Sequence, residues 1–173
     1  PEDILVLSGG SGGVINEILK YPTIKKIDYV EIDSTIIKIV DRFSTPLTQK
    51  ELNNSKVNLH YYDGRLFVKK ARSQYDVILL NLPPPLTLQV NRFFTQEFFS
   101  FIKNILKQRG IFVLTLTGSS AYYTEELKAL NKTILTTLIS VFPYLFVIPG
   151  DFNIFLSSNH YDISQITPQV LIE

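Results

Sequence analysis

Glycines and polar residues follow four apolar segments of this sequence, and their types suit hydrogen bonding to a small polar ligand. A glycine-rich turn, 8–13, comes directly after the first apolar run, and Glu31 ends the second. Asp63 with Gly64 follows the third run, and Asn81 ends the fourth. Glycines let a backbone approach a ligand closely, and carboxylates accept hydrogen bonds from hydroxyl and amino groups. Together these residues could bind the ribose and base of a nucleoside.

The glycine-rich turn by itself also fits a purely structural tight turn. It does not match the dinucleotide fingerprint G-x-G-x-x-G. Counted from Gly10, the third glycine position is Ile15, and counted back from Gly13, the first position is Ser8. The mismatch disfavours a nicotinamide or flavin oxidoreductase. A helix expected after the turn would offer unpaired N–H groups and a positive dipole end to a ligand.

The acidic residues also have simpler explanations. Either Glu31 or Asp33 could cap a helix, and Asp63 with Gly64 could form a common Asp-Gly turn. Glu31 nevertheless follows the glycine turn by about 20 residues, the separation at which an acidic residue holds the ribose hydroxyls of a bound nucleotide. In combination, the glycine turn and the acidic residues favour a nucleoside site.

The elements that must position these residues alternate between β-rich runs and helical ones, which is typical of a parallel sheet covered by helices. The expected strands are 4–8, 27–32, 57–61, 75–80, 111–116, 144–148 and 153–158. The expected helices are 12–21, 33–43, 65–71, 95–106 and 124–142, and 45–56 is expected to be a polar surface loop. We therefore predict a doubly wound α/β fold with a mostly parallel seven-stranded sheet and one antiparallel strand. All four polar groups would then meet at the carboxyl edge, where open sheets bind ligands.

Composition is that of one ordinary folded domain. The chain has 173 residues, of which 45% are hydrophobic and 19% charged, and its formal net charge is +1. Such a charge gives no electrostatic case for nucleic acid or an anionic membrane. With no cysteines and two distant histidines, we expect no metal site. The uncharged stretch 133–150 contains Pro143 and fits a helix end, a turn and a strand better than a membrane span.

Five segments resemble, in order, motifs of the spermidine synthase family. Residues 6–17 resemble G-G-G-D-G-G-x-x-R-E, residues 29–33 the V-E-I-D strand end, residues 63–67 D-G-x-x-F, residues 75–84 Y-D-V-I-x-x-D-x-x-D-P, and residues 91–99 L-Y-T-x-E-F-Y. The resemblance runs from about residue 3 to residue 158. It implies a class I S-adenosylmethionine-dependent methyltransferase fold, with residues 1–158 as the nucleoside-binding domain and 159–173 as a tail.

The resemblance also implies a ligand and the residues that bind it. The ligand would be S-adenosylmethionine, its decarboxylated form or methylthioadenosine, with its ribose on Glu31, its adenine beside Asp63 and its amino-acid or aminopropyl arm along the glycine turn. The implied binding residues are Gly9, Gly10, Ser11, Gly12, Glu31, Ile32, Asp63 and Gly64.

Three family carboxylates are missing. Ser11 replaces the aspartate that faces the cationic amine, Asn81 replaces the catalytic aspartate, and Pro84 replaces the second aspartate of D-x-x-D-P. An amide has no usable basicity near neutral pH. Two hypotheses follow. The first is a small-molecule transferase in which Asn81 positions the acceptor. The second is a catalytically degenerate nucleoside-binding domain with a regulatory or structural role.

Partners and location are expected from the same resemblance. Residues 81–87 and 91–95 are similar to spermidine-synthase-like domains joined to membrane-spanning segments in some bacterial proteins. Because the sequence begins at Pro1 without a methionine, we expect a piece of a longer protein. We expect a small-molecule nucleoside ligand, no nucleic acid and no membrane insertion by this chain, and leave a homodimer open. The expected location is cytoplasmic, with tethering to the cytoplasmic face of the membrane as an alternative for the full-length protein.

Overall fold

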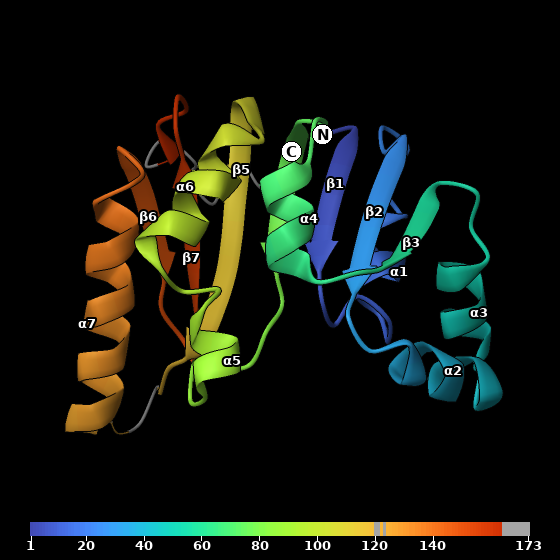
Figure 1. Ribbon diagram of the computed structural model, residues 1–173, viewed down its shortest axis with the longest axis horizontal. Coiled ribbons are helices and arrows are strands. Elements are labelled where there is room, and N and C mark those ends of the chain that lie inside the picture. Colours follow the sequence, from blue (N-terminus) through green and yellow to red (C-terminus); the bar gives the residue numbers. More distant parts are fainter. Residues whose placement is uncertain (120–121, 123, 164–173) are drawn as a thin grey trace.

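One sheet of seven strands runs through the molecule in the order β3-β2-β1-β4-β5-β7-β6 (Figure 1). The computed structural model describes residues 1–119, 122 and 124–163. The strands are β1 (Asp3–Leu7), β2 (Lys26–Glu31), β3 (Val57–Tyr61), β4 (Tyr75–Leu80), β5 (Leu106–Thr117), β6 (Tyr144–Ile148) and β7 (Phe152–Ser158). Strands β1 to β5 pair in parallel, and β7 is antiparallel to both of its neighbours. The predicted fold class is confirmed.

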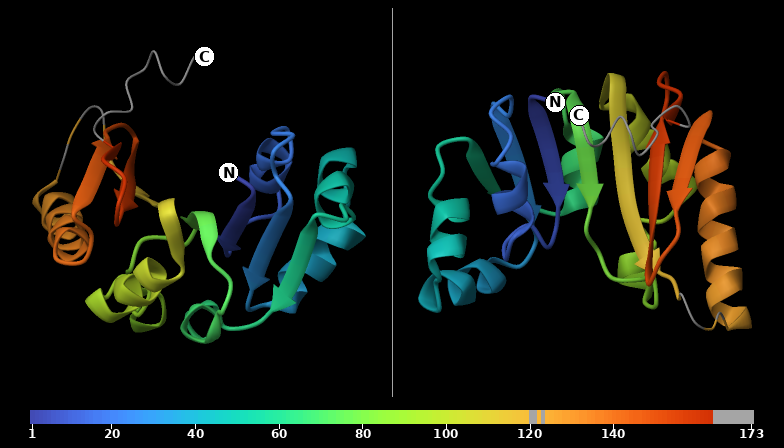
Figure 2. Two further views of the ribbon diagram at one scale, coloured as in Figure 1. Left: turned by 90° about the horizontal axis from the view of Figure 1, so that it is seen from above. Right: turned by 180° about the vertical axis from the view of Figure 1, so that it is seen from behind.

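Helices cover the sheet on two sides. They are α1 (Val14–Ile18), α2 (Ser34–Arg42), α3 (Pro46–Leu52), α4 (Gly64–Lys70), α5 (Leu88–Asn91), α6 (Gln96–Asn104) and α7 (Glu125–Ile139). In Figures 1 and 2, α4 and α6 lie on one face of the sheet and α1 on the other. No helix in the described part of the chain combines the length and apolar content that crossing a bilayer requires.

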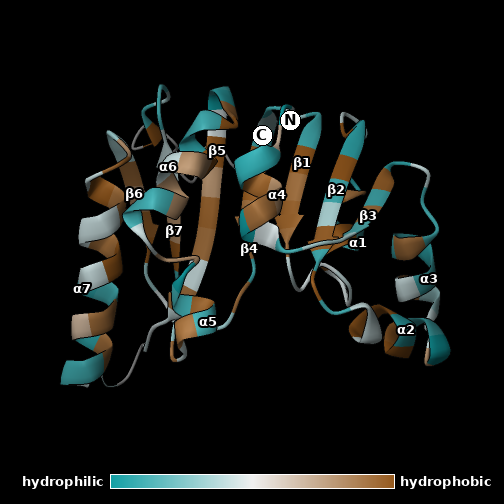
Figure 3. Ribbon diagram, viewed as in Figure 1, coloured by the Kyte–Doolittle hydropathy of each residue, from teal (hydrophilic) through white to brown (hydrophobic). Residues whose placement is uncertain are grey.

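The apolar core is divided by the sheet, as the pleat of β1 shows. Leu5 and Leu7 belong to the larger buried cluster, on the side of α4, α6 and α7, whereas Ile4 and Val6 belong to the cluster with Ile15 of α1. Figure 3 shows the central strands as the most hydrophobic part of the ribbon. A strand buried on both faces reads as a continuous apolar run, which is why these strands could be predicted.

The segment 45–56 was expected to be a loop, and this prediction is wrong, because residues 46–52 form helix α3. Thr45 caps the helix: its hydroxyl accepts from the N–H of Thr48, whose own hydroxyl accepts from the N–H of Thr45, and Pro46 occupies the first turn. Proline at this position is a recognised helix-start signal. The helix has two leucines in seven residues, so its apolar pattern is too sparse to reveal it.

Several other boundaries differ from the expected ones. Helix α1 is shorter than 12–21, α6 ends at Asn104, and β5 begins at Leu106 rather than Ile111. The short helix α5 follows the proline run and was not expected. Within the expected tail, Ile163 is fully buried, and residues 164–173 lie outside the described part.

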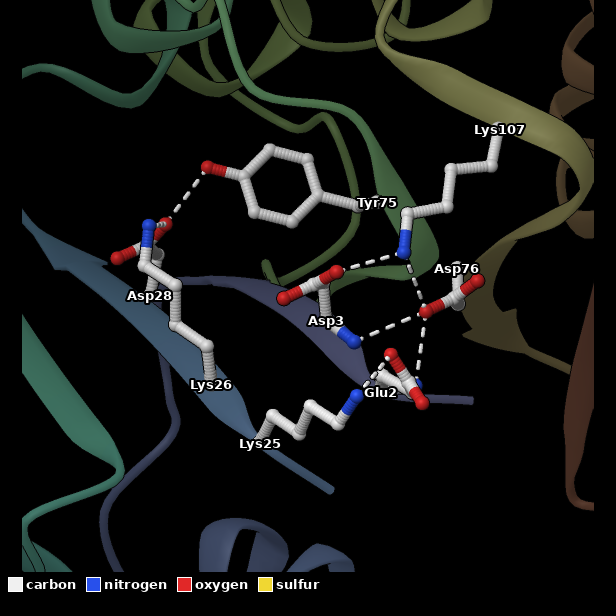
Figure 4. A network of polar contacts seen from close by, with 8 residues as sticks. All are labelled: Glu2, Asp3, Lys25, Lys26, Asp28, Tyr75, Asp76 and Lys107. Carbon is white, nitrogen blue, oxygen red and sulfur yellow. Dashed lines mark hydrogen bonds and ion pairs between the residues drawn. The ribbon is translucent and has the colours of Figure 1, made fainter. Parts of the chain in front are cut away.

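A buried carboxylate of β2, Asp28, bonds to side chains of β2, β3 and β4, of which Figure 4 shows Lys26 and Tyr75. Its oxygens lie 2.7 Å from Nζ of Lys26, 3.0 Å from Nε2 of His60 and 2.8 Å from the hydroxyl of Tyr75. Burial alone would raise the pKa of Asp28, but the bonds from these three side chains outweigh burial and hold its pKa below the ordinary value.

This network should make folding stability sensitive to acid. Asp28 binds its proton less readily when folded, so its contribution is complete above the unfolded pKa of about 3.9 and is lost as pH falls through the lower folded value. In urea titrations, Asp28→Asn should lower the free energy of unfolding by about 1.5–3 kcal/mol near neutral pH. The variant should also lose less of its free energy of unfolding than the wild type as the pH falls below about 4. Asp41→Asn, at an exposed aspartate of α2, is the control. If the free energy of unfolding of Asp28→Asn fell below about pH 4 as steeply as that of the wild type, the network would not be the source of the acid sensitivity.

Candidate functional site

The four loops predicted to carry chemistry meet at the carboxyl edge of the sheet, which is the lower edge in Figure 1. The register places Leu7, the last residue of β1, beside Val30 of β2 and Leu80 of β4. Glu31 pairs with Tyr61 of β3. Because these strands are parallel neighbours, the glycine turn and the residues after β2, β3 and β4 lie together.

The glycine turn follows β1 with an unusual backbone. Ser8 and Gly9 have φ values of 64° and 57°, in the left-handed region that favours glycine. Gly10 is required for a different reason. A Cβ built on Gly10 would lie 2.9 Å from the ring of Tyr29 and 3.0 Å from Cδ1 of Ile15. The turn therefore packs directly on the side chains beneath it.

Glu31 lies at the end of β2 and faces this turn. Its side chain is buried, with the residue 3% exposed, and one oxygen accepts from the Ser8 hydroxyl at 3.1 Å and the Gly9 N–H at 3.4 Å. The Tyr29 hydroxyl reaches the same oxygen at 3.3 Å. Burial raises the pKa of Tyr29, and the charge of Glu31 adds to this effect, so the hydroxyl stays a donor. The capping role considered for both acids belongs to Asp33, which accepts from the Thr35 N–H at the start of α2.

Asp63 both caps a helix and forms an ion pair. One oxygen accepts from the N–H of Leu66 at 3.0 Å at the start of α4, and the other accepts from the guanidinium of Arg92. Burial alone would raise the pKa of Asp63, but these bonds and the charge of Arg92 lower it overall. The guanidinium also lies 4.9 Å from the ring centroid of Phe93. Arg92 and Phe93 are not among the site residues predicted from the sequence, although a cation beside a run of aromatic residues is a visible signal.

Asn81 holds the glycine turn in place. Its side-chain amide nitrogen donates to the carbonyl of Gly9 at 2.7 Å, and its backbone N–H donates to the carbonyl of Leu7 at 3.0 Å. The nitrogen must face Gly9, because a carbonyl can only accept. The amide therefore has a structural partner within the turn.

Two adjoining hollows open at this edge and share Ile32, Leu82, Arg92 and Phe93. The inner one, about 60 Å³, is also lined by Glu31 and Gly64, among others, and the outer one, about 650 Å³, also by Asp63. Mostly apolar walls with a few polar groups are typical of small-molecule sites.

The predicted binding residues divide between these hollows and their surroundings. Four of them line the hollows: Glu31, Ile32, Asp63 and Gly64. The turn residues Gly9, Gly10, Ser11 and Gly12 do not line either one. Asn81 instead borders a separate hollow of about 110 Å³ with Val14 and Val113.

Sequence comparisons find one family model and a set of similar proteins. The family model described as the spermine/spermidine synthase domain matches residues 1–160. The polyamine aminopropyltransferase of Bacillus cereus is 36% identical over 143 residues, which is 83% of this chain and 50% of that protein. The corresponding Bacillus subtilis protein is 39% identical over 127 residues, 73% of this chain and 45% of that protein. The chain thus spans about half the length of these relatives.

Solved structures share the fold. A spermidine synthase in complex with the transition-state analogue AdoDATO superposes with a TM-score of 0.80 at 22% identity, covering 100% of this chain and 60% of the other. Human methyltransferase-like protein 13 in complex with SAH superposes with a TM-score of 0.76 at 25% identity, covering 99% and 78%.

Proposed function

Because this chain belongs to the spermine/spermidine synthase domain family, we propose that it binds an S-adenosyl-type nucleoside at the carboxyl edge of its sheet. The observation that carries this proposal is the buried acceptor Glu31 in the inner hollow together with Asp63 in the outer hollow that adjoins it. A nucleoside needs acceptors for its ribose hydroxyls and its adenine amino group, separated by flat apolar walls.

In this arrangement the ribose hydroxyls donate to Glu31, and the adenine lies between Ile32 and Phe93 with its amino group toward Asp63. A carboxylate offers about four acceptor positions, so the bonds from Leu66 and Arg92 leave Asp63 able to accept another. The arm of the ligand then extends toward the turn, with Gly9, Gly10, Ser11 and Gly12 beside it. S-adenosylmethionine, its decarboxylated form and methylthioadenosine all have the required nucleoside. The adenosyl ligands named for the two structural neighbours support this class.

The chemistry we propose is that of a spermidine-synthase-like domain that transfers a group from this nucleoside to an acceptor needing no carboxylate base at position 81. Asn81 would orient the acceptor through its side-chain oxygen. A second candidate is a domain that binds the nucleoside without catalysing a reaction. It would have a regulatory or structural role in a larger, membrane-tethered protein. The bond from the Asn81 amide to the Gly9 carbonyl favours the second candidate, because it gives Asn81 a role that needs no reaction.

Substitution of Glu31 tests the binding site. In calorimetric titrations with methylthioadenosine, Glu31→Ala should weaken binding by about 1.5–3 kcal/mol, the usual value of hydrogen bonds to a charged group. That loss is roughly 10- to 150-fold in Kd. Glu31→Gln, which preserves side-chain size, should fall between this variant and the wild type. Glu126→Gln, at an exposed glutamate of α7, is the matched control. Unchanged affinity in a folded Glu31→Ala variant would refute the ribose assignment.

A further inference from the structure

Glu51 is a fully buried carboxylate that the family motifs leave without a role. It lies on α3, is 0% exposed, and reaches the glycine turn and the start of α1. One oxygen accepts from the N–H of Gly12 at 3.0 Å, and the other from the N–H groups of Gly13 at 2.8 Å and Asn16 at 2.9 Å. All three donors are backbone N–H groups, so these bonds do not depend on the side chains at positions 12, 13 and 16.

These bonds fix the second half of the turn. Gly12 and Gly13 have φ values of 107° and 130°, which side chains rarely allow. A buried carboxylate is costly unless hydrogen bonds satisfy it, and this one has three. The first half of the turn is held separately, by Glu31 at Gly9 N–H and by Asn81 at Gly9 carbonyl. Loss of Glu51 would therefore free Gly12 and Gly13, to which no other side chain described above is bonded.

The same bonds occupy donors that would otherwise attract an anion. Successive unpaired backbone N–H groups in a turn commonly bind phosphate or carboxylate groups. Here the protein supplies the carboxylate itself. A negatively charged ligand group at Gly12 and Gly13 would find these donors engaged and would meet the charge of Glu51 at close range.

We propose that Glu51 is a positioning residue that sets the glycine turn and selects nucleosides whose arm carries no negative charge. The selection rests on the proposed function, because it requires an adenosyl ligand whose arm lies along this turn. Methylthioadenosine, with a neutral arm, is then preferred over S-adenosylhomocysteine, whose arm carries a carboxylate.

The positioning role is tested without any ligand, by amide hydrogen exchange measured by NMR. In the wild type, the amides of Gly12, Gly13 and Asn16 should exchange slowly. In Glu51→Gln their exchange should be faster by about tenfold or more, because the amide group cannot accept all three bonds. Glu126→Gln is the control. If Glu51→Gln does not fold, Glu51→Asp replaces it, since it keeps the charge but shortens the reach. Unchanged exchange in a folded variant overturns the positioning role.

The selection is tested by titrating methylthioadenosine and S-adenosylhomocysteine into the wild type and Glu51→Gln. The wild type should prefer methylthioadenosine, and the variant should narrow that preference by about fivefold or more, a change that general destabilisation would not produce. An equal preference in both proteins overturns the selection. A wild type that binds neither nucleoside overturns the proposed function and the selection with it, while the exchange measurement still decides the positioning role.

Discussion

Gly10→Val is expected to weaken methylthioadenosine binding by about 10-fold or more, because displacing the turn disturbs Glu31, whose hydrogen bonds to the ligand are worth about 1.5–3 kcal/mol. A Cβ at position 10 would already lie 2.9 Å from the Tyr29 ring, and valine adds two methyl groups to it. Both Tyr29 and Ile15 are fully buried, so neither can move aside without disturbing the core. The turn must shift instead, and the hydroxyl of Tyr29 and the N–H of Gly9 would no longer both reach Glu31.

The control for this variant must separate a displaced turn from an unfolded chain. Ala129→Val introduces the same side chain on the exposed surface of α7. Thermal unfolding shows whether both variants are folded, and calorimetric titration then compares their affinities for the nucleoside. A folded Gly10→Val variant that binds the nucleoside within about threefold of the wild type would mean that the packing of the turn on Tyr29 does not support the site.

Aminopropyl transfer to putrescine is the second large expected effect: this chain should show little or none. The acceptor amine, with a pKa of about 10.4 like that of lysine, must lose a proton to react, and a general base typically contributes about 10²–10⁴-fold in rate. Asn81 cannot take the proton, and its amide already donates to Gly9. Asp76, at the start of β4, is bonded to the N–H groups of Glu2 and Asp3 far from the site edge (Figure 4).

The Asn81→Asp variant shows whether a base alone would restore the reaction. An aspartate places a carboxylate oxygen where the amide nitrogen now donates, so two acceptors would face each other across 2.7 Å. We therefore expect Asn81→Asp to loosen the glycine turn and to give no turnover. The assay is methylthioadenosine formation from decarboxylated S-adenosylmethionine and putrescine. Turnover by the wild type would refute the expectation, and a gain of activity in Asn81→Asp would show that the bond to Gly9 is dispensable.

The sheet and the gathering of the polar loops at its carboxyl edge could be predicted from the sequence, because both depend on local patterns. Strand β1 reads as a continuous apolar run, and polar residues follow each of the first four strands. The choice between Glu31 and Asp33 needed coordinates, since either acid could cap α2 and only the direction of the side chain decides. The sequence marks Gly10 only as one glycine of the turn, and its close packing on Tyr29 needed coordinates.

The missed features are contacts between residues distant in sequence. Glu51 reaches Gly13 from a helix that has too few apolar residues to be recognised, 38 positions away. Arg92 pairs with Asp63 across 29 positions, and Asn81 meets Gly9 across 72. No local periodicity encodes such pairs, so the sequence alone does not reveal that Asn81 supports the turn.

The most direct test of an adenosyl site at this edge is NMR shift mapping of the isotope-labelled chain during titration with methylthioadenosine. Binding as proposed should produce saturable shifts at the amides of Gly9, Ile32 and Gly64. The hairpin of β6 and β7, at the far end of the sheet, should be unaffected. No saturable shift, or shifts confined to the separate hollow beside Asn81 and Val113, would contradict the assignment.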